Sequence, residues 1–257
     1  MSIKNLEPNG LWKNFYELTQ IPRPSKKEEK VVAFLKQFGE NLGLETIVDK
    51  VGNVIIRKPA TPGYEDRMGV VLQAHVDMVP QKNSDKVHDF EKDPIETRIE
   101  DGWVKANGTT LGADNGVGAA AAMAVLEATD LVHGPIEGLF TIDEETGMTG
   151  ANALEPGVLK GDILINMDSE TEGELYVGCA GGIDTCGYFT PKFEDVPAGS
   201  KAFQLIVKGL KGGHSGMDII LGRANANKVM NALVLTATEK FHARVADIQG
   251  GSLRNAI

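Results

Sequence analysis

Cysteine is nearly absent from the sequence: Cys179 and Cys186 are its two cysteines among 257 residues. A disulfide scaffold is therefore excluded, because small disulfide-stabilised folds are dense in cysteine. The spacing of the pair fits neither a zinc ribbon nor a redox C-x-x-C motif. We therefore expect two buried, reduced thiols that pack like small apolar side chains.

Long apolar runs and basic clusters are also missing. No apolar stretch approaches the roughly 18 residues of a membrane span, and the first ten residues, MSIKNLEPNG, lack the pattern of a secretory signal. We therefore expect a cytoplasmic protein with no membrane partner. Lys and Arg number 26 against 36 Asp and Glu, a net charge of −10. Because phosphate binding needs clustered Lys and Arg, the sequence argues against a nucleic-acid partner.

The composition is that of an ordinary globular protein, with 42% hydrophobic and 24% charged residues. Ser25 and Glu28 have the spacing of a capping box in front of a helix whose apolar residues recur at helical spacing. Expected strands and helices then alternate, which favours an α/β fold. The expected strands are 44–48, 54–56, 68–74, two short strands within 95–104, 136–142 and 163–167, and an alanine-rich helix is expected at 116–128.

The pattern changes near Gly181 and Gly182, where we place a domain boundary. The first domain would cover residues 1–181 and the second residues 182–257. For the second domain the sequence predicts strands at 183–189 and 202–208, a glycine-rich turn at 209–216 and a helix at 224–238.

Polar side chains cluster where the apolar strands of the first domain end. In open α/β sheets functional groups gather at the carboxyl ends of strands. Each residue alone has an ordinary explanation, such as a helix cap or a turn, but their convergence favours a zinc or hard-cation site. The residues are His75 and Asp77 after one strand, Glu144 and Glu145 after the next, Asp168 after the third, and Asp114 at a helix entrance.

Four segments resemble the ordered signature blocks of the M20 metallopeptidases. They read HVDMVP at 75–80, TLGADNG at 110–116, DEETGM at 143–148 and NMDSE at 166–170. Their wording is most similar to the aminoacylhistidine dipeptidase branch of that family, and GGHSG at 212–216 matches the lid-domain motif of the family.

The resemblance implies a centre of two zinc ions. Asp114 would bridge both ions, His75 and Asp168 would bind one of them, and Glu145 would bind the other. A carboxylate has two oxygens and can span two metals, which agrees with the role implied for Asp114. Zn²⁺ is the expected metal, although Co²⁺ or Mn²⁺ could occupy a site rich in carboxylates.

The resemblance also implies three catalytic roles. Glu144 would be the general base, Asp77 would hydrogen-bond the far nitrogen of His75, and His214 would steady the substrate or the oxyanion from the lid, across a dimer interface. Adjacent glutamates on an extended chain face opposite ways, so one could bind metal while the other accepts a proton.

The implied function is hydrolysis of short peptides, namely dipeptides of the Xaa-His type, by a water molecule that two zinc ions activate. The implied fold is α/β, with a zinc-peptidase-like catalytic domain built on a mixed sheet flanked by helices, plus the start of an α+β lid domain that forms a homodimer when complete. The chain contains no block that matches the late histidine of the family. We therefore expect that the C-terminal half of the family layout is absent and that activity is impaired.

The sequence alone leaves other functions open. A related M20 hydrolase, either a tripeptide aminopeptidase or an amidohydrolase of N-acyl amino acids, would use the same zinc ligands. A catalytically impaired relic or binding subunit would keep the fold alone. Dinucleotide-binding, serine-hydrolase and cysteine-hydrolase functions are disfavoured, because their motifs are missing.

Overall fold

The computed structural model describes residues 2–169, 171, 173–178, 181, 185–213 and 218–250. The chain divides into two compact units, Met1–Gly181 and Gly182–Ile257. No helix in the described part of the chain is long and apolar enough to cross a membrane.

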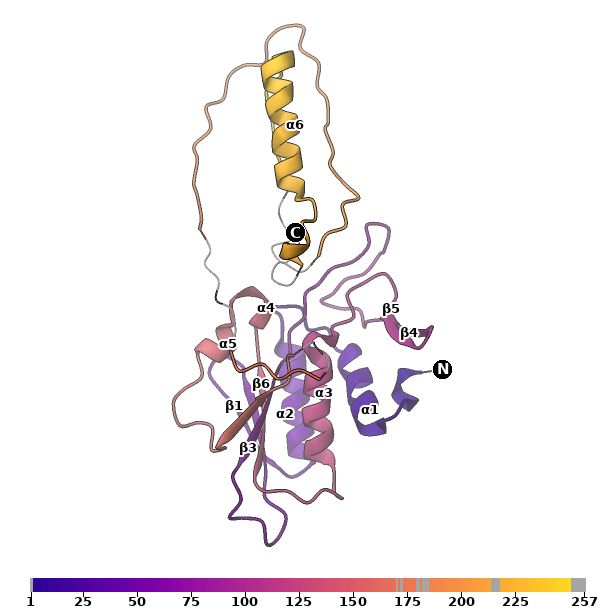
Figure 1. Ribbon diagram of the computed structural model, residues 1–257, viewed down its shortest axis with the longest axis vertical. Coiled ribbons are helices and arrows are strands. Elements are labelled where there is room, and N and C mark those ends of the chain that lie inside the picture. Colours follow the sequence, from indigo (N-terminus) through magenta and orange to yellow (C-terminus); the bar gives the residue numbers. More distant parts are fainter. Residues whose placement is uncertain are drawn as a thin grey trace. The chain divides into compact units, whose positions relative to one another are not determined.

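A five-stranded mixed sheet forms the centre of the first unit (Figure 1). Its strand order is β1-β2-β6-β3-β7, in which β3 pairs in parallel with both β6 and β7, while β2 is antiparallel to β1 and β6. The strands are β1 (Glu45–Val48), β2 (Val54–Lys58), β3 (Val70–His75), β6 (Ile136–Thr141) and β7 (Ile163–Asn166). A separate hairpin joins β4 (Thr97–Glu100) to β5 (Trp103–Ala106).

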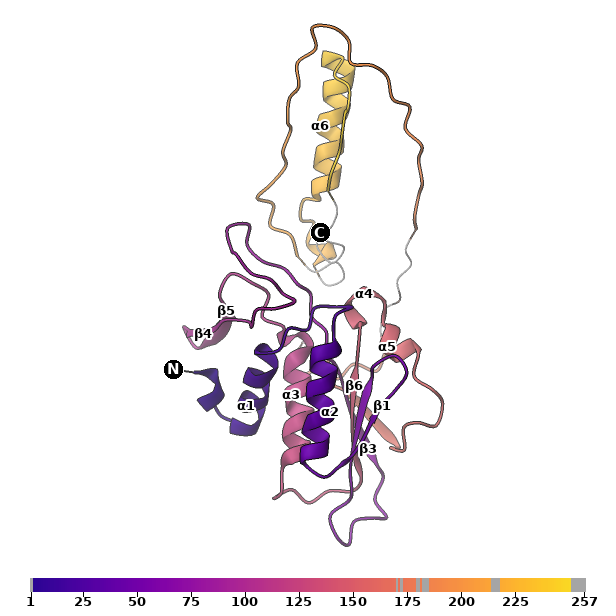
Figure 2. The same cartoon turned by 180° about the vertical axis from the view of Figure 1, so that it is seen from behind.

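Three helices lie on one face of this sheet, as Figure 2 shows. They are α1 (Asn9–Thr19), α2 (Glu29–Asn41) and α3 (Ala113–Glu127), and a short 3-10 helix, η1 (Ile3–Asn5), precedes them. Helix α2 buries Val31 and Leu35, four residues apart, because that spacing places them on one helical face. The side chains between these helices and the sheet form the main hydrophobic core.

Helix α3 packs very closely on the sheet. Its buried face is built mainly from alanine and glycine, and a Cβ atom added to Gly138 of β6 would lie 2.8 Å from Leu126 of α3. Strand β6 is buried along its whole length, as expected for a strand covered on both faces. The opposite face holds a smaller core of Ile55, Val71 and Leu139.

Two short helices follow β6 in the first unit, α4 (Glu144–Gly147) and α5 (Thr149–Asn152). Strand β7, which follows them, forms one edge of the described sheet, opposite β1, and is exposed. Three successive apolar residues of β7, Ile163, Leu164 and Ile165, are 39%, 54% and 46% exposed.

The second unit contains the 3-10 helix η2 (Ile219–Leu221) and helix α6 (Ala226–Phe241) among its described residues. The predicted helix at 224–238 is confirmed, but the strands predicted at 183–189 and 202–208 do not form within the described residues. A strand needs a hydrogen-bonded neighbour, and an isolated pair is only marginally stable. In this part of the chain Phe189 and Phe203 are 92% and 89% exposed.

Candidate metal centre

The predicted site residues lie at one edge of the sheet, where the parallel strands β3, β6 and β7 end. His75 is the last residue of β3, Glu144 and Glu145 begin α4 just after β6, and Asp168 follows β7. Asp114 comes from the start of α3, where its backbone and that of the next residue are not yet helical. Segments distant in the sequence therefore meet here, because parallel strands end at the same edge.

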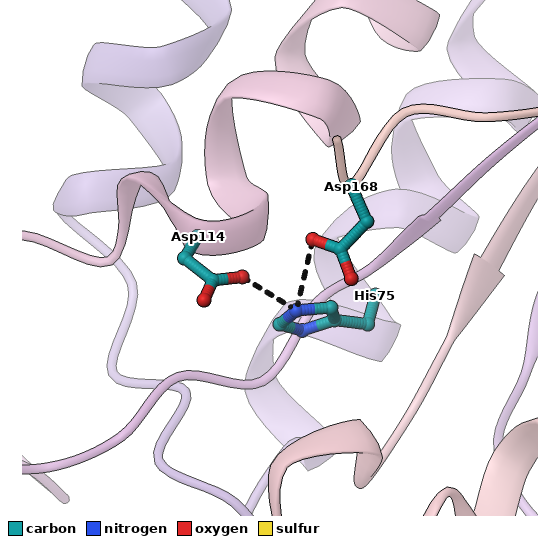
Figure 3. Close-up of side chains that lie close together, drawn as sticks. All are labelled: His75, Asp114 and Asp168. Carbon is teal, nitrogen blue, oxygen red and sulfur yellow. Dashed lines mark hydrogen bonds and ion pairs between the residues drawn. The ribbon is translucent and has the colours of Figure 1, made fainter. Parts of the chain in front are cut away.

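The His75 imidazole faces two carboxylates (Figure 3). Its Nε2 atom lies 2.9 Å from Oδ1 of Asp114 and 3.6 Å from Oδ1 of Asp168. Each of the three residues offers a ligand atom, and these atoms all lie within 4.8 Å of one another. His75 itself is 1% exposed, so its ring is fixed by the surrounding protein.

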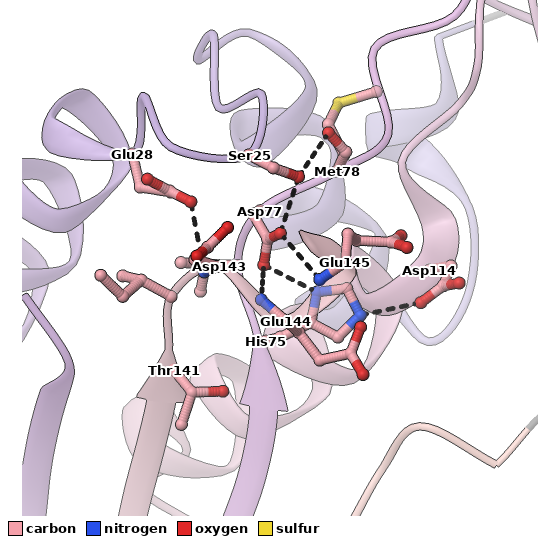
Figure 4. A network of polar contacts seen from close by, with 12 residues as sticks. Ser25, Glu28, His75, Asp77, Met78, Asp114, Thr141, Asp143, Glu144 and Glu145 are labelled. Carbon is pink, nitrogen blue, oxygen red and sulfur yellow. Dashed lines mark hydrogen bonds and ion pairs between the residues drawn. The ribbon is translucent and has the colours of Figure 1, made fainter. Parts of the chain in front are cut away.

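Asp77 supports the other side of the imidazole and is completely buried (Figure 4). Its Oδ1 atom lies 3.2 Å from Nδ1 of His75 and accepts a hydrogen bond from the backbone N–H of Glu144 at 3.0 Å. Its Oδ2 atom accepts from the backbone N–H of Glu145 at 3.2 Å and from the Ser25 hydroxyl at 2.8 Å. One carboxylate thus lies against the histidine and holds the turn that carries both glutamates.

The two glutamates lie in the single turn of α4, so the premise of an extended chain was wrong. Asp143 precedes them in the left-handed region, with φ of 49°. Its carboxylate accepts hydrogen bonds from the hydroxyls of Thr146, at 2.5 Å, and Thr149. These bonds fold the chain back immediately after β6. The helical turn leaves both backbone N–H groups at its start free to bond Asp77.

The electrostatics of the site reflect crowded carboxylates. Burial and the Asp114 charge raise the pKa of Glu145 to about 7, and burial together with Asp114 raises the pKa of Asp168 to about 6. Burial alone would lower the pKa of His75, but its carboxylate neighbours Asp114 and Asp77 raise that pKa to about 10.

These residues fit a divalent cation. An imidazole nitrogen and carboxylate oxygens are ligands that Zn²⁺ takes in proteins. A cation would also favour the charged forms of Glu145 and Asp168, whose pKa values are raised by burial and by the Asp114 charge. The group whose ligand atoms lie within 4.8 Å of one another contains His75, Asp114 and Asp168 but not Glu145.

The predicted lid residue His214 lies outside the described residues. The expectation of buried thiols was wrong for Cys186, which is exposed in an irregular segment, and Cys179 also lies outside the described residues.

Sequence reasoning missed the residues that support the site from the segment before α2. Ser25 and Glu28 do not form the predicted capping box: the Ser25 hydroxyl donates to Asp77, and Glu28 Oε1 accepts from the backbone N–H groups of Lys26 and Asp143. Asp143, which bonds Glu28, was also missed as a supporting residue. The only sequence signal for its role was its position directly before Glu144 and Glu145.

Glu28, Asp77 and Asp143 form a second group of carboxylates within 4.8 Å of one another, and all three are buried. Burial raises the pKa of Glu28, and the charges of Asp77 and Asp143 raise it further, although two backbone N–H groups oppose the shift. Asp77 contacts His75 and Asp143 precedes α4, so we regard this group as part of the support of the metal centre.

Comparison with protein families and known proteins gives a consistent result. The model of peptidase family M20/M25/M40 matches residues 71–245. The chain is 52% identical over 255 residues to the cytosol non-specific dipeptidase of Escherichia coli, which covers 99% of this chain and 53% of that protein. The chain therefore spans about half the length of this curated relative.

Solved structures agree with this result. The aminoacylhistidine dipeptidase of Vibrio alginolyticus superposes with a TM-score of 0.70 at 49% identity, over all of this chain and 52% of that one. The aminopeptidase PepT of Bacillus cereus superposes with a TM-score of 0.54 at 26% identity, over 65% of this chain and 44% of that one.

Proposed function

The chain belongs to peptidase family M20/M25/M40, and from this membership we propose that it is part of a metal-dependent dipeptidase that acts on dipeptides of the Xaa-His type. The observation that carries the proposal is the arrangement of His75 between the Asp77 carboxylate on one side and those of Asp114 and Asp168 on the other. The name of the Escherichia coli relative, a non-specific dipeptidase, supports dipeptides as the substrate class. The name of the Vibrio alginolyticus relative, an aminoacylhistidine dipeptidase, supports the Xaa-His type.

We assign the metal ligands from this geometry and from the family resemblance. His75 and Asp168 would hold one ion, Glu145 would hold a second, and Asp114 would bridge the two. When bound, such ions lower the pKa of water toward neutrality and polarise a carbonyl group. Zn²⁺ is the proposed metal because of the imidazole and carboxylate donors, with Co²⁺ and Mn²⁺ as the alternatives.

Each supporting residue has a role that follows from its contacts. Asp77 fixes the orientation of the His75 ring through Nδ1, so that Nε2 faces the carboxylates. Glu144 is held by its own backbone N–H on Asp77, and its carboxylate is proposed to accept a proton from the attacking water and to pass it to the leaving amine. His214 is proposed to steady the oxyanion or the substrate.

The two structural units suggest a division of labour. We propose that Met1–Gly181 is the catalytic part and that Gly182–Ile257 belongs to a lid through which the whole protein forms a homodimer. A cytoplasmic location is proposed from the description of the Escherichia coli relative as a cytosol enzyme.

A second candidate function is a tripeptide aminopeptidase, which the structural likeness to the Bacillus cereus aminopeptidase favours. It would use the same ligands and the same proton acceptor. The difference would lie in the peptide that the site accepts, so a comparison of substrates separates the two functions.

The test combines metal analysis with substrate comparison. The purified chain is equilibrated with zinc, dialysed and analysed for metal, and hydrolysis of Ala-His, of a tripeptide and of an acetylated amino acid is then measured. About two ions per chain and a preference for Ala-His support the proposal. Preferred cleavage of the tripeptide supports the second candidate. A folded chain that retains no metal overturns both functions and supports a binding role.

A further inference from the structure

Arg23 is a buried cation that links two segments of the metal centre. Its side chain is 2% exposed and ranks among the largest fully buried side chains of the described residues. Its Nη1 atom donates to the backbone carbonyls of Val76, at 2.8 Å, and Asp77, at 3.2 Å. Its Nη2 atom donates to the carbonyl of Gly112 at 2.6 Å. One guanidinium therefore joins the end of β3 to the turn that leads into Asp114.

The surrounding backbone leaves space for this guanidinium and for little else. A Cβ atom at Gly112 would lie 2.6 Å from Nη2 of Arg23, and one at Gly116 would lie 2.5 Å from the same atom. Gly112 has φ of +70°, so its backbone alone favours glycine. Gly116 has no such positive φ, so a side chain fails to fit there mainly because of Arg23, with Cε2 of Phe15 next at 3.2 Å.

The contacts of Arg23 differ from those of a buried ion pair. Its hydrogen bonds within the described residues all go to backbone carbonyls, and Nε has no hydrogen-bond partner there. Burial lowers the pKa of Arg23 to about 10, although the nearby charges of Asp77 and Asp114 oppose this shift, so the group stays cationic at neutral pH. Burial of such a charge is costly unless it is compensated. Here three backbone carbonyls and the nearby Asp77 and Asp114 charges compensate it, and the hydrogen bonds fix the spacing of the two segments.

We propose that Arg23 is a positioning residue of the metal centre, which sets the separation between His75 on β3 and Asp114 on α3 by bonding the backbone of both segments. This inference rests on the proposed function, because it assigns Arg23 to the same ligand set. A lysine at this position would keep the charge but not the planar fork, so it could not hold both segments in the same geometry.

Two substitutions test the inference in complementary ways. Arg23→Lys removes the fork, while Gly116→Ala leaves Arg23 in the chain and forces its guanidinium away. Binding of Co²⁺ is followed by its visible absorption, and thermal unfolding is followed without metal. We expect both variants to bind Co²⁺ about 10–100-fold more weakly with an altered spectrum, which is the usual effect of losing a residue that orients metal ligands.

Arg57→Lys is the matched control. Arg57 on β2 also bonds a backbone carbonyl, that of Val158 at 2.5 Å, and it bonds Glu137 at 2.8 Å, near the opposite edge of the sheet. This variant is expected to lose thermal stability but to keep the Co²⁺ affinity and spectrum of the unaltered chain. A merely structural role of Arg23 would give the same pattern for Arg23→Lys, and that result would overturn the inference.

The outcome for the unaltered chain separates the two proposals. If it binds Co²⁺ and Arg23→Lys binds equally well with the same spectrum, the role of Arg23 is wrong and the proposed function stands. If the folded, unaltered chain binds no Co²⁺, the metal centre itself is wrong and the role of Arg23 falls with it.

Discussion

The backbone N–H of Glu144 donates to Oδ1 of Asp77 at 3.0 Å, across 67 residues of sequence. The same carboxylate oxygen lies 3.2 Å from Nδ1 of His75. The proposed metal ligand His75 and the proposed proton acceptor Glu144 thus both contact the buried carboxylate of Asp77. Displacement of that group would disturb both at once.

Substitution Asp77→Asn is expected to weaken zinc binding by about 10–100-fold, because the amide has a single acceptor oxygen for the contacts that two oxygens now make. Competition with a chromophoric chelator measures the affinity. Asp162→Asn serves as a control, since Asp162 accepts the backbone N–H of Gly69 at 2.9 Å near the start of β7, at the other end of that strand. Equal affinities for the two variants would contradict the role of Asp77.

Substitution Glu144→Gln is expected to remove nearly all peptide hydrolysis and to leave the zinc content unchanged. Glutamine keeps the backbone N–H that bonds Asp77 but cannot accept the proton. Metal analysis and the rate of Ala-His cleavage are measured on the same preparation. Hydrolysis at the unaltered rate would show that another group takes the proton.

Glu28 is expected to make stability depend on pH. Its pKa is raised from 4.5 in the folded chain by burial and by the Asp77 and Asp143 charges, so the folded state retains the proton more strongly than the unfolded state. The free energy of unfolding should therefore fall as pH rises from about 4.5 through the folded-state pKa. Glu28→Gln keeps an acceptor oxygen and should lose this dependence.

Urea unfolding across pH 4 to 8 measures the effect of Glu28. The advantage of Glu28→Gln over the unaltered chain should grow with pH across this range. Parallel curves for the two proteins would mean that Glu28 ionises equally easily in the folded and unfolded states.

Gly150 of α5 packs closely against the backbone of Ile142, which follows β6. A Cβ atom there would lie 2.6 Å from the carbonyl oxygen of Ile142, so Gly150→Ala should lower the free energy of unfolding by about 1–3 kcal/mol. Gly147→Ala is the matched control, because a Cβ at Gly147 meets nothing within 4 Å. It should leave stability unchanged or raise it by up to about 1 kcal/mol. Denaturant unfolding of both variants distinguishes packing from helix propensity.

Much of the sheet was predictable because short apolar runs are typical of strands. The runs at 68–74, 136–142 and 163–167 correspond to β3, β6 and β7. The helix predicted at 116–128 overlaps α3 (Ala113–Glu127), which begins three residues earlier and ends one residue earlier. The convergence of His75, Asp114 and Asp168 also followed from the sequence, since strand ends of a parallel sheet meet at one edge.

The supports of the site were not predictable, because their partners are distant in the sequence. Ser25 and Glu28 have the spacing of a local capping box, yet both side chains bond residues that lie 52 and 115 positions away. Local propensity is a weak signal where a tertiary contact satisfies the same groups. The strands predicted at 183–189 and 202–208 were wrong for the described residues for a related reason. A strand forms only where a neighbouring strand pairs with it.

The parallel placement of β3 between β6 and β7 also has a kinetic consequence. His75 is separated by 39 residues from Asp114, and Gln73 of β3 by 93 residues from its bonded partner Asn166 of β7. The chain loses entropy when such long loops close, before the contacts between their ends stabilise the fold, and this slows folding. A nascent chain that ends before β7 lacks Asp168, so it cannot yet form the group of His75, Asp114 and Asp168.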